Sequence, residues 1–179
     1  MVRLVEEFTL SQIAALSDNF ALGKDNKLLW HYSEDMKFFK MMTVNKVMIM
    51  GRKTFESFPN PLPGRHHIVV SRSADTMDSD SPLVHFVKDI SMAVELAKVF
   101  VKEYSLNPEI MVCGGAEIYK QTLKICDILY LTRIKGDYNA DTFYPNEFEK
   151  YFTLTMTKPS ATHPTDLIYQ SWGRNKTTA

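Results

Sequence analysis

The sequence is poor in cysteine, with two in 179 residues. Cys113 and Cys126 lie in or beside apolar runs and lack the spacing of metal ligands. Two such thiols do not make the disulfide framework of a small secreted protein, so we expect reduced core residues in a cytoplasmic protein. The five histidines show no ligand spacing either, and we expect no bound metal.

The sequence also lacks an excess of either charge and any long hydrophobic run. Lys plus Arg number 21 and Asp plus Glu number 21, so no overall field favours nucleic acid, and any anion site must be local. No stripe of interleaved aromatic and basic residues suits nucleic acid. No apolar run approaches the roughly 20 residues that span a bilayer, and Met1–Glu7 has acids where a signal peptide is apolar. We therefore expect neither nucleic acid nor a membrane as a partner.

Neither an internal repeat nor a linker divides the chain, so residues 1–179 are interpreted as a single domain. Short apolar runs with β-branched residues predict buried strands. These runs are Ile13–Leu16, Val47–Met50, Ile68–Val70, Ile110–Cys113 and Ile128–Leu131. Helical patterns intervene at Ser33–Met42, Thr54–Phe58, Ser91–Tyr104 and Ala116–Leu123. The alternation predicts an α/β fold with a mostly parallel central sheet and helices on both faces.

The C-terminal part of the chain has a different pattern. Phe152–Thr157 alternates apolar and polar residues, and Leu167–Trp172 follows it after a Pro-containing loop. Alternation of this kind is typical of strands with one face exposed, so we expect an antiparallel hairpin at the edge of the sheet. The polar stretch Ser73–Pro82 predicts a surface loop.

One acid lies on the apolar face of the first predicted helix, for which Ser33 is a good N-cap. At about 100° per residue, the apolar side chains on either side of Asp35 are those of Met36, Phe38, Phe39 and Met42. An ionised carboxylate there is costly unless it is hydrogen-bonded, and a ligand with two adjacent N–H donors would meet that need. The alternative is that a first-turn acid only complements the helix dipole. Glu34 falls toward the margin of the face, so Asp35 is the candidate.

Two predicted strands end in glycine directly before a helix. The first continues as Gly51, Arg52, Lys53 and Thr54, and the second as Gly114 and Gly115. Glycine permits close backbone approach, and the first N–H groups of a helix favour phosphate. Neither matches a known phosphate fingerprint, so an ordinary tight turn is the alternative for each alone. Both together favour a ligand at the carboxyl ends of the strands. Ser71–Ser73 adds a cation and two hydroxyls suited to a phosphate monoester.

These segments together resemble the dihydrofolate reductase family, in the family's order and over most of the chain. The resemblance is carried by Ile13–Leu16, Leu22–Trp30, Glu34–Lys40, Met50–Ser57, Pro61–Arg65, Cys113–Gly115, Tyr119, Leu131–Thr132 and Asp141–Phe143. A tryptophan, an acid five residues later, G-R-K-T, L-P-G-R and paired glycines in this order are highly specific. The resemblance implies reduction of 7,8-dihydrofolate to tetrahydrofolate by hydride transfer from NADPH. We also expect a monomer.

The resemblance implies that Asp35 accepts hydrogen bonds from the pterin N3–H and 2-amino group, and that Thr132 orients the carboxylate. Trp30 would help to fix a catalytic water, through which the proton reaches N5, and Leu28 belongs to the same catalytic set. Arg65 would bind the substrate's α-carboxylate, although a solvated turn is its alternative. The remaining substrate-binding residues would be Ile13, Ala15, Met36, Phe39, Phe58, Leu62, Cys113 and Tyr119. Plain core packing is the competing account for the apolar ones.

On the cofactor side the resemblance assigns the 2′-phosphate to Arg52, Ser71 and Arg72. The bridging phosphates would meet Thr54, Gly114, Gly115 and Thr142, with a cis peptide between the two glycines. The loop Leu22–Leu28 would close over the nicotinamide. Further cofactor-binding residues would be Ala15, Gly23, Asn26, Gly51, Lys53, Cys113, Glu117, Ile118 and Tyr119.

The chain departs from the family at Leu29, where proline normally precedes the tryptophan, so a φ constraint is lost and an N–H is freed. Cys113 stands where the family is usually aliphatic, and packing is favoured over a redox role. One rival is the same-fold reductase of riboflavin synthesis, which Asp35 and Arg65 argue against. The other is a catalytically silent binding or structural homologue.

Overall fold

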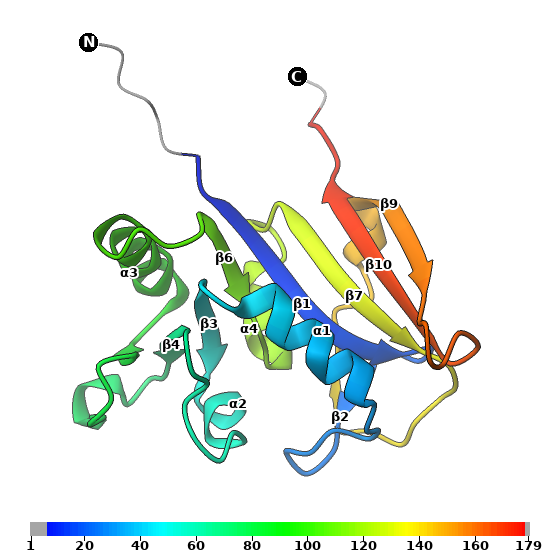
Figure 1. The fold of residues 1–179 in the computed structure, drawn as a ribbon, viewed down its shortest axis with the longest axis horizontal. Coiled ribbons are helices and arrows are strands. Elements are labelled where there is room, and N and C mark those ends of the chain that lie inside the picture. The colour runs from blue at the N-terminus through cyan, green and yellow to red at the C-terminus, as the bar shows by residue number, and fades with distance from the viewer. Residues whose placement is uncertain (1–6, 178–179) are drawn as a thin grey trace.

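The computed structural model describes residues 7–177, which fold around one mixed β-sheet (Figure 1). The strands are β1 Thr9–Ser17, β2 Ala21–Gly23, β3 Val47–Gly51, β4 His66–Val70, β5 Val84–Val87, β6 Glu109–Val112, β7 Ile128–Ile134, β8 Thr142–Phe143, β9 Phe152–Pro159 and β10 Leu167–Arg174. The helices are α1 Ser33–Thr43, α2 Arg52–Glu56, α3 Ile90–Glu103 and α4 Ala116–Thr122, with single 3₁₀ turns η1 Ala74–Thr76 and η2 Phe148–Lys150.

The central sheet has eight strands in the order β5-β4-β3-β6-β1-β7-β10-β9. The pairs from β5 to β7 are parallel, and β10 is antiparallel to both β7 and β9. β2 and β8 form a separate antiparallel pair. The predicted mostly parallel sheet with an antiparallel C-terminal hairpin at its edge is therefore confirmed.

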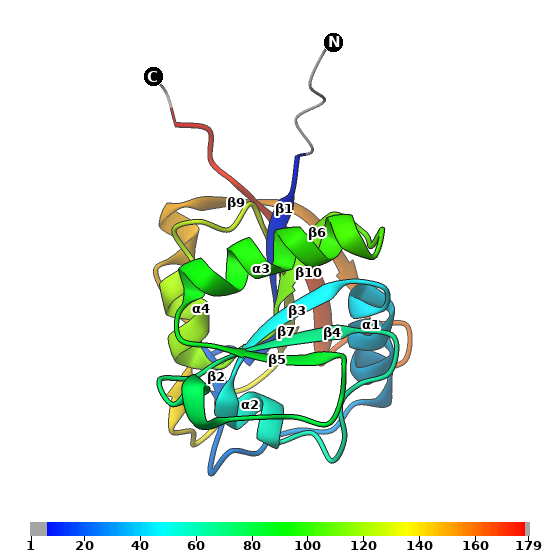
Figure 2. The same ribbon diagram turned by 90° about the vertical axis from the view of Figure 1, so that its left-hand side faces the viewer.

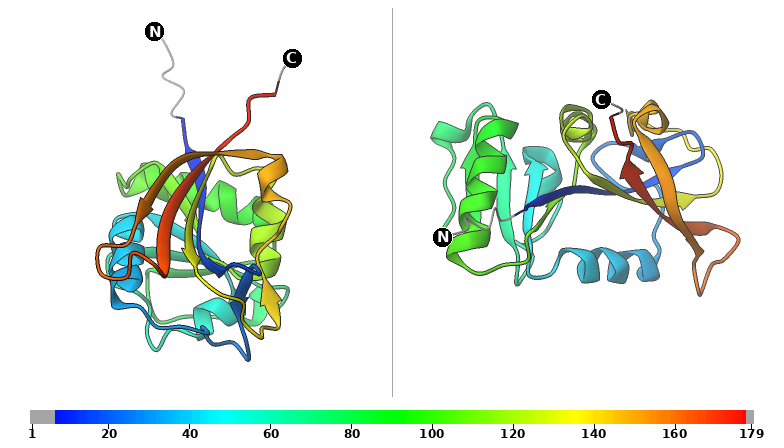
Figure 3. Two further views of the ribbon diagram at one scale, coloured as in Figure 1. Left: turned by 90° about the vertical axis from the view of Figure 1, so that its right-hand side faces the viewer. Right: turned by 90° about the horizontal axis from the view of Figure 1, so that it is seen from above.

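Helices cover both faces of the sheet, as the right-hand view of Figure 3 shows, with α1 on one side and α3 and α4 on the other. Figure 2 shows α3 lying across β3, β4 and β5. Val47 and Ile49 of β3 face the α3 side, whereas Met48 and Met50 face the α1 side. All four side chains have no exposed surface. A strand buried on both faces needs apolar residues at every position, which explains its unbroken apolar run.

The structure differs from the prediction at the start of α1, at both ends of α2 and in the loop Ser73–Pro82. α1 begins after Tyr32, which is the N-cap residue without a side-chain bond, so the prediction of a Ser33 N-cap was wrong. The amide of Met36 bonds the Tyr32 carbonyl, so the helix starts one residue earlier than the cap pattern indicates. α2 starts directly after Gly51 and ends before Ser57, two residues earlier than predicted at each end. The loop Ser73–Pro82 contains the short turn η1.

No helix within residues 7–177 is long and apolar enough to cross a bilayer. The segment Met1–Glu7, from which the absence of a signal peptide was predicted, lies outside the described residues except for Glu7. Cys113 and Cys126 are both buried and free, as predicted.

Candidate active site

Asp35 is held by a residue that lies 97 positions away in the chain. The hydroxyl of Thr132 on β7 donates a hydrogen bond of 2.8 Å to Oδ1 of Asp35 on α1. This contact confirms the predicted pairing, and the other oxygen, Oδ2, has no hydrogen-bond donor within residues 7–177. Burial raises the pKa of Asp35, the Thr132 bond opposes that rise, and the neighbouring Glu34 charge adds to it. A first-turn acid serving only the helix dipole would be solvated, so this arrangement favours a ligand-binding role.

The adjacent acid, Glu34, faces a different part of the molecule. It accepts hydrogen bonds from the Ser160 hydroxyl, the Ala161 amide at 3.0 Å and the Thr162 hydroxyl at 2.9 Å. The Ser160 bond is the main cause that lowers the pKa of Glu34 to about 2. Burial opposes this shift, and the bonds from Ala161 and Thr162 add to it. The choice of Asp35 over Glu34 as the inward acid therefore agrees with the structure.

An apolar cluster on the α1 face lies beside Asp35. Five of the predicted substrate-binding residues belong to it: Ile13, Phe39, Phe58, Leu62 and Cys113. Ala15 is also close, because it is the Cα partner of Thr132 between β1 and β7. Met36 and Leu28 are not drawn into this cluster, since their side chains are 55% and 67% exposed. Met36, which the helical pattern placed beside Asp35, therefore lies at the solvent margin of α1.

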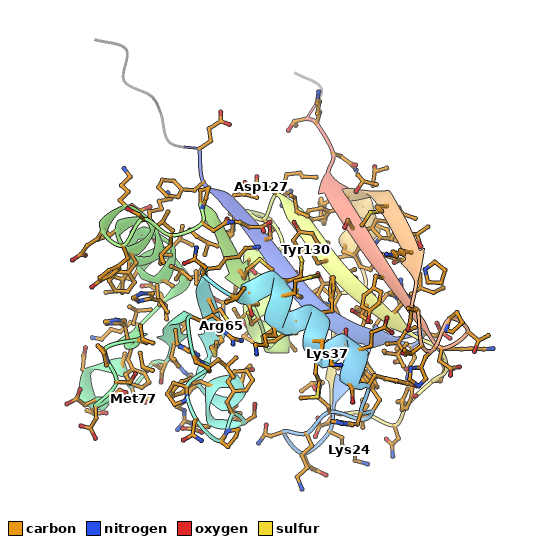
Figure 4. All side chains as sticks on the ribbon, viewed as in Figure 1. Lys24, Lys37, Arg65, Met77, Asp127 and Tyr130 are labelled. Atoms are coloured by element: carbon orange, nitrogen blue, oxygen red, sulfur yellow. The ribbon has the colours of Figure 1, made fainter. Side chains whose placement is uncertain are left out.

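Arg65 is buried at the same face and is not part of a solvated turn. Only 4% of its surface is exposed. Nε donates to the Pro63 carbonyl at 2.9 Å, and Nη1 donates to the Thr43 hydroxyl at 3.4 Å. Figure 4 labels it beyond the C-terminal end of α1, with Lys37 nearer the other end. No carboxylate within residues 7–177 forms an ion pair with Arg65, and burial lowers its pKa. A buried guanidinium without a counter-ion suits an anionic ligand.

The two glycine turns meet at the carboxyl edge of the sheet. The Gly51 amide donates to the Gly114 carbonyl at 2.8 Å, and the peptide between Gly114 and Gly115 is cis, as the resemblance implied. A Cβ on Gly115 would lie 3.4 Å from the Thr54 hydroxyl. A Cβ on Gly114, whose φ is +116°, would lie 3.2 Å from the Tyr119 hydroxyl. The turns therefore form one close-fitting backbone cradle, which suits a diphosphate.

Tyr119 joins the cradle to the substrate face. Its hydroxyl donates to the Ile13 carbonyl at 2.6 Å, and burial raises its pKa well above the ordinary value. Ile118, from the same helix, lies against the cradle, since its Cγ1 would be 3.3 Å from a Cβ on Gly51. Glu117 of α4 is exposed and accepts a bond from Gln121, so nothing draws it into the cradle.

The cations assigned to the 2′-phosphate surround this edge without being buried. Arg52, with 47% of its side chain exposed, lies 3.7 Å from Glu56, and Lys53 and Arg72 are exposed. Ser71 is buried, and its hydroxyl lies 3.1 Å from that of Ser73. Solvated cations beside fixed hydroxyls can close on a phosphate at little cost in desolvation.

The loop Leu22–Leu28 is a tight hairpin that is tied to β8. Gly23 and Thr142 pair across the two strands, and the Thr142 hydroxyl donates to the Gly23 carbonyl at 3.1 Å. Asn26, with a φ of +59°, lies at the exposed tip. Leu22 packs against the core on the α3 and α4 face. The structure therefore places Gly23, Asn26 and Thr142 together, but Leu22 faces away from the apolar cluster that contains Ile13.

Tyr169 is a neighbour of Asp35 that the sequence did not reveal. It is the Cα partner of Thr132 across β10 and β7, and its ring lies 4.6 Å from that of Phe38. Burial, with the nearby Asp35 and Glu34 charges, raises the pKa of Tyr169 to about 12. Its hydroxyl and Nε1 of Trp30 are both buried, and neither has a hydrogen-bond partner between residues 7 and 177. Only the pairing of β10 with β7 could have indicated Tyr169.

Open α/β sheets bind ligands at the carboxyl ends of their strands. A fold with an acid-bearing apolar face and a glycine cradle at this edge is that of an α/β enzyme with two ligand sites side by side. The family model described as dihydrofolate reductase matches residues 9–174. The chain therefore belongs to the dihydrofolate reductase family.

Individual relatives agree with this assignment. A dihydrofolate reductase type 9 of Escherichia coli is 38% identical over 167 residues, which is 92% of each chain. A dihydrofolate reductase of Bacillus subtilis is 36% identical and covers 83% of each chain. A solved dihydrofolate reductase of Enterococcus faecalis, complexed with NADP(H) and RAB-propyl, has a TM-score of 0.78 and 28% identity. That match covers 94% of this chain and 97% of the other.

Proposed function

We propose that Asp35, Thr132 and Arg65 bind the substrate of the family's reaction. The chain is an NADPH-dependent reductase that converts 7,8-dihydrofolate to 5,6,7,8-tetrahydrofolate. The observation that carries the residue assignment is the half-buried Asp35 carboxylate, which accepts a bond from Thr132 on one oxygen and has no donor to the other among the described residues. A pterin presents N3–H and a 2-amino group side by side, and this pair of donors matches a carboxylate.

The other substrate contacts follow from burial and charge. The aminobenzoyl ring would lie against Phe39, Phe58 and Leu62, which are partly buried at the edge of the apolar cluster. The substrate's α-carboxylate would give Arg65 the counter-ion that no carboxylate in the described part of the chain supplies. Holding the substrate at both ends fixes the pterin ring relative to the bound cofactor, so orientation is a main part of the catalysis.

The residues at the carboxyl edge fit NADPH, because the cradle at Gly51, Gly114 and Gly115 leaves no room for side chains against a diphosphate. Thr54 would bond that diphosphate, while Arg52 and Ser71 would bond the 2′-phosphate. Bound NADPH supplies the hydride that the substrate accepts at C6. Trp30 Nε1 would hold the water that carries a proton to N5, because Asp35 would bind the distant 2-amino end.

The reaction of a riboflavin-pathway reductase does not require both Asp35 and Arg65. A catalytically silent homologue would not require any residue of the site. The named relatives of this chain are dihydrofolate reductases. We also propose that the chain acts as one cytoplasmic domain and as a monomer, without nucleic acid. Its balanced charge supports the last point, and light scattering of the purified protein tests the monomer.

The test is the loss of NADPH absorbance with dihydrofolate. We expect Asp35→Asn to lower kcat/KM for dihydrofolate by about 10²-fold or more at pH 7, because an amide cannot hold the polarised pterin. Asp80→Asn, in an exposed loop, is the matched control and should keep full activity. Folded wild-type protein without dihydrofolate-dependent oxidation would end the proposal, and an active Asp35→Asn enzyme would remove Asp35 from it.

A further inference from the structure

A second acid is built into the start of α1, next to Asp35. Glu34 receives three donors from the turn between β9 and β10: two hydroxyls, from Ser160 and Thr162, and the Ala161 amide. Those donors lie more than 120 residues away in sequence. Exposed glutamates on helices are normally solvated or paired with a nearby cation. Three converging donors are instead a specific long-range contact between two elements.

This contact completes a closed path around Asp35. The β9–β10 turn leads directly into β10, where Leu167 pairs with Ile134 and Tyr169 pairs with Thr132 on β7. Thr132 in turn bonds Asp35, the next residue after Glu34 on α1. In Figures 1, 2 and 3 the N-terminal end of α1 lies beside the β9–β10 turn in every view. The first turn of α1 is therefore held to the β7–β10 pair at two adjacent residues.

We propose that Glu34 is a positioning residue that fixes Asp35 against Thr132 by tying α1 to the β9–β10 turn. The inference rests on the proposed role of Asp35. The hydrogen bond from Thr132 fixes the Asp35 carboxylate at one point, and the attachment at the preceding residue adds a second restraint on rotation and sliding of the first turn of α1. Small errors in the position of a binding carboxylate lower the rate of the bound reaction strongly.

Glu34 also acts on Asp35 through its charge. The surrounding titratable groups are Asp35 and Lys37 on α1, Tyr169 on β10, and His31, Tyr32 and His163 on the flanking loops. Glu34 contributes to raising the pKa of Asp35. Removing its charge should lower that pKa, whereas removing a single hydroxyl donor leaves the charge in place.

Three variants separate these effects. Glu34→Ala removes the attachment and the charge, and Glu34→Gln keeps the length and one acceptor without the charge. Thr162→Val removes one donor and keeps the β-branched shape. Glu95→Ala, on the exposed side of α3, is the matched control. Thermal melting of each variant establishes that it is folded before its kinetics are read.

We expect Glu34→Ala to raise KM for dihydrofolate and lower kcat, each by about tenfold, with KM for NADPH unchanged. Glu34→Gln should recover part of the loss, and Thr162→Val should show a smaller loss of the same kind. In an Asp35→Asn background, Glu34→Ala should have little further effect, because the group it positions is gone. A general structural role would weaken the binding of dihydrofolate and of NADPH equally. Equal increases in the two KM values, or kinetics like those of Glu95→Ala, would therefore overturn the inference.

A readout independent of turnover is the carboxyl NMR titration of Asp35 in the protein without ligands. We expect a downward shift of the Asp35 pKa in Glu34→Gln and none in Glu95→Ala. An unshifted Asp35 in Glu34→Gln would overturn the electrostatic part. If the wild type fails to oxidise NADPH with dihydrofolate, the proposed function fails, and this titration still decides whether Glu34 controls Asp35.

Discussion

The Asp35 carboxyl group lies one helical turn from Phe38 and Phe39, and burial raises its pKa despite the Thr132 bond. The inward direction of Asp35 could be predicted because the helical period depends only on local sequence. The attachment of Glu34 and the position of Tyr169 could not, since both depend on the distant β9–β10 hairpin. Arg65 was assigned by resemblance alone, because a turn sequence does not reveal that its side chain is buried.

Asp35→Asn is expected to make the protein more stable at pH 7 while it removes activity. The folded pKa of Asp35 lies above the ordinary value of 3.8. The protonated Asp35 therefore contributes its full stabilisation below pH 3.8. This contribution to the free energy of unfolding is lost as the pH rises through the folded pKa. An uncharged amide can still accept the Thr132 bond, so we expect a gain of about 1 kcal/mol at neutral pH.

Urea unfolding at pH 7 measures this gain as a higher midpoint, and the difference from wild type should shrink near pH 4. Asp80→Asn serves again as the control. A lower midpoint for Asp35→Asn at pH 7 would show that the carboxylate is stabilising and would contradict the raised pKa.

At the scale of elements, the buried central strands were predictable and the pairing-dependent ones were not. β3 has four consecutive fully buried apolar residues, a local pattern. β5 has two half-buried residues among four, and β8 is two exposed residues recognisable only by their pairing with β2. Such strands are defined by hydrogen bonds to distant segments and carry little hydrophobic pattern of their own.

One half-buried carboxylate, that of Glu109, joins the N-terminal ends of the four strands β1, β3, β6 and β7. It accepts hydrogen bonds from Lys46 at 2.6 Å and from Ser11 and Tyr130 at 2.8 Å each. Burial alone would raise the Glu109 pKa, but these bonds together lower it. Its contribution to stability is present above the ordinary pKa of 4.5 and is lost as the pH falls through the lower folded value.

We expect Glu109→Gln to lower the free energy of unfolding by about 3 kcal/mol at pH 7, because the Lys46 ammonium is left buried without its charge partner. Tyr130→Phe, which removes one donor, should cost about 1 kcal/mol. Denaturant unfolding at pH 7 compares the two, and the Glu109→Gln deficit should narrow below pH 4.5. Equal stability of Glu109→Gln and wild type would show that the network contributes nothing net.

At the scale of the whole molecule, the site depends on a strand order that the sequence pattern does not specify. β1 lies between β6 and β7, so Ile13 and Ala15 reach both the glycine cradle and Thr132. The α/β class follows from alternating local patterns. The order follows from long-range pairing, and it was not predicted from the sequence.

Two buried histidines make the stability of the whole fold sensitive to mild acid. His67 bonds on both ring nitrogens: Nε2 accepts from the Leu62 amide at 3.0 Å, and Nδ1 lies 3.3 Å from the Leu83 carbonyl. An amide can only donate, so the ring is neutral with its proton on Nδ1. His66 stacks on Tyr104 at 4.8 Å, and its buried Nδ1 has no hydrogen-bond partner among residues 7–177. Burial is the main cause that lowers the pKa of both rings.

Because both folded pKa values lie below 6.5, the neutral rings favour folding fully above pH 6.5, and this contribution is lost as the pH falls through the folded values. We therefore expect the urea concentration at the unfolding midpoint to decrease as the pH is lowered from 7.5 to 5.5. In His67→Gln, the amide oxygen can accept from Leu62, and we expect the midpoint to depend less on pH even if its value at pH 7.5 is lower. His163→Gln, on an exposed turn, is the control and should keep the pH dependence of the wild type. Protonating His67 requires the Leu62 amide to lose its acceptor, and Leu62 belongs to the apolar cluster beside Asp35. Acidification should therefore weaken dihydrofolate binding before the protein unfolds globally. An unchanged urea midpoint between pH 7.5 and pH 5.5 would show that neither ring resists protonation in the folded protein.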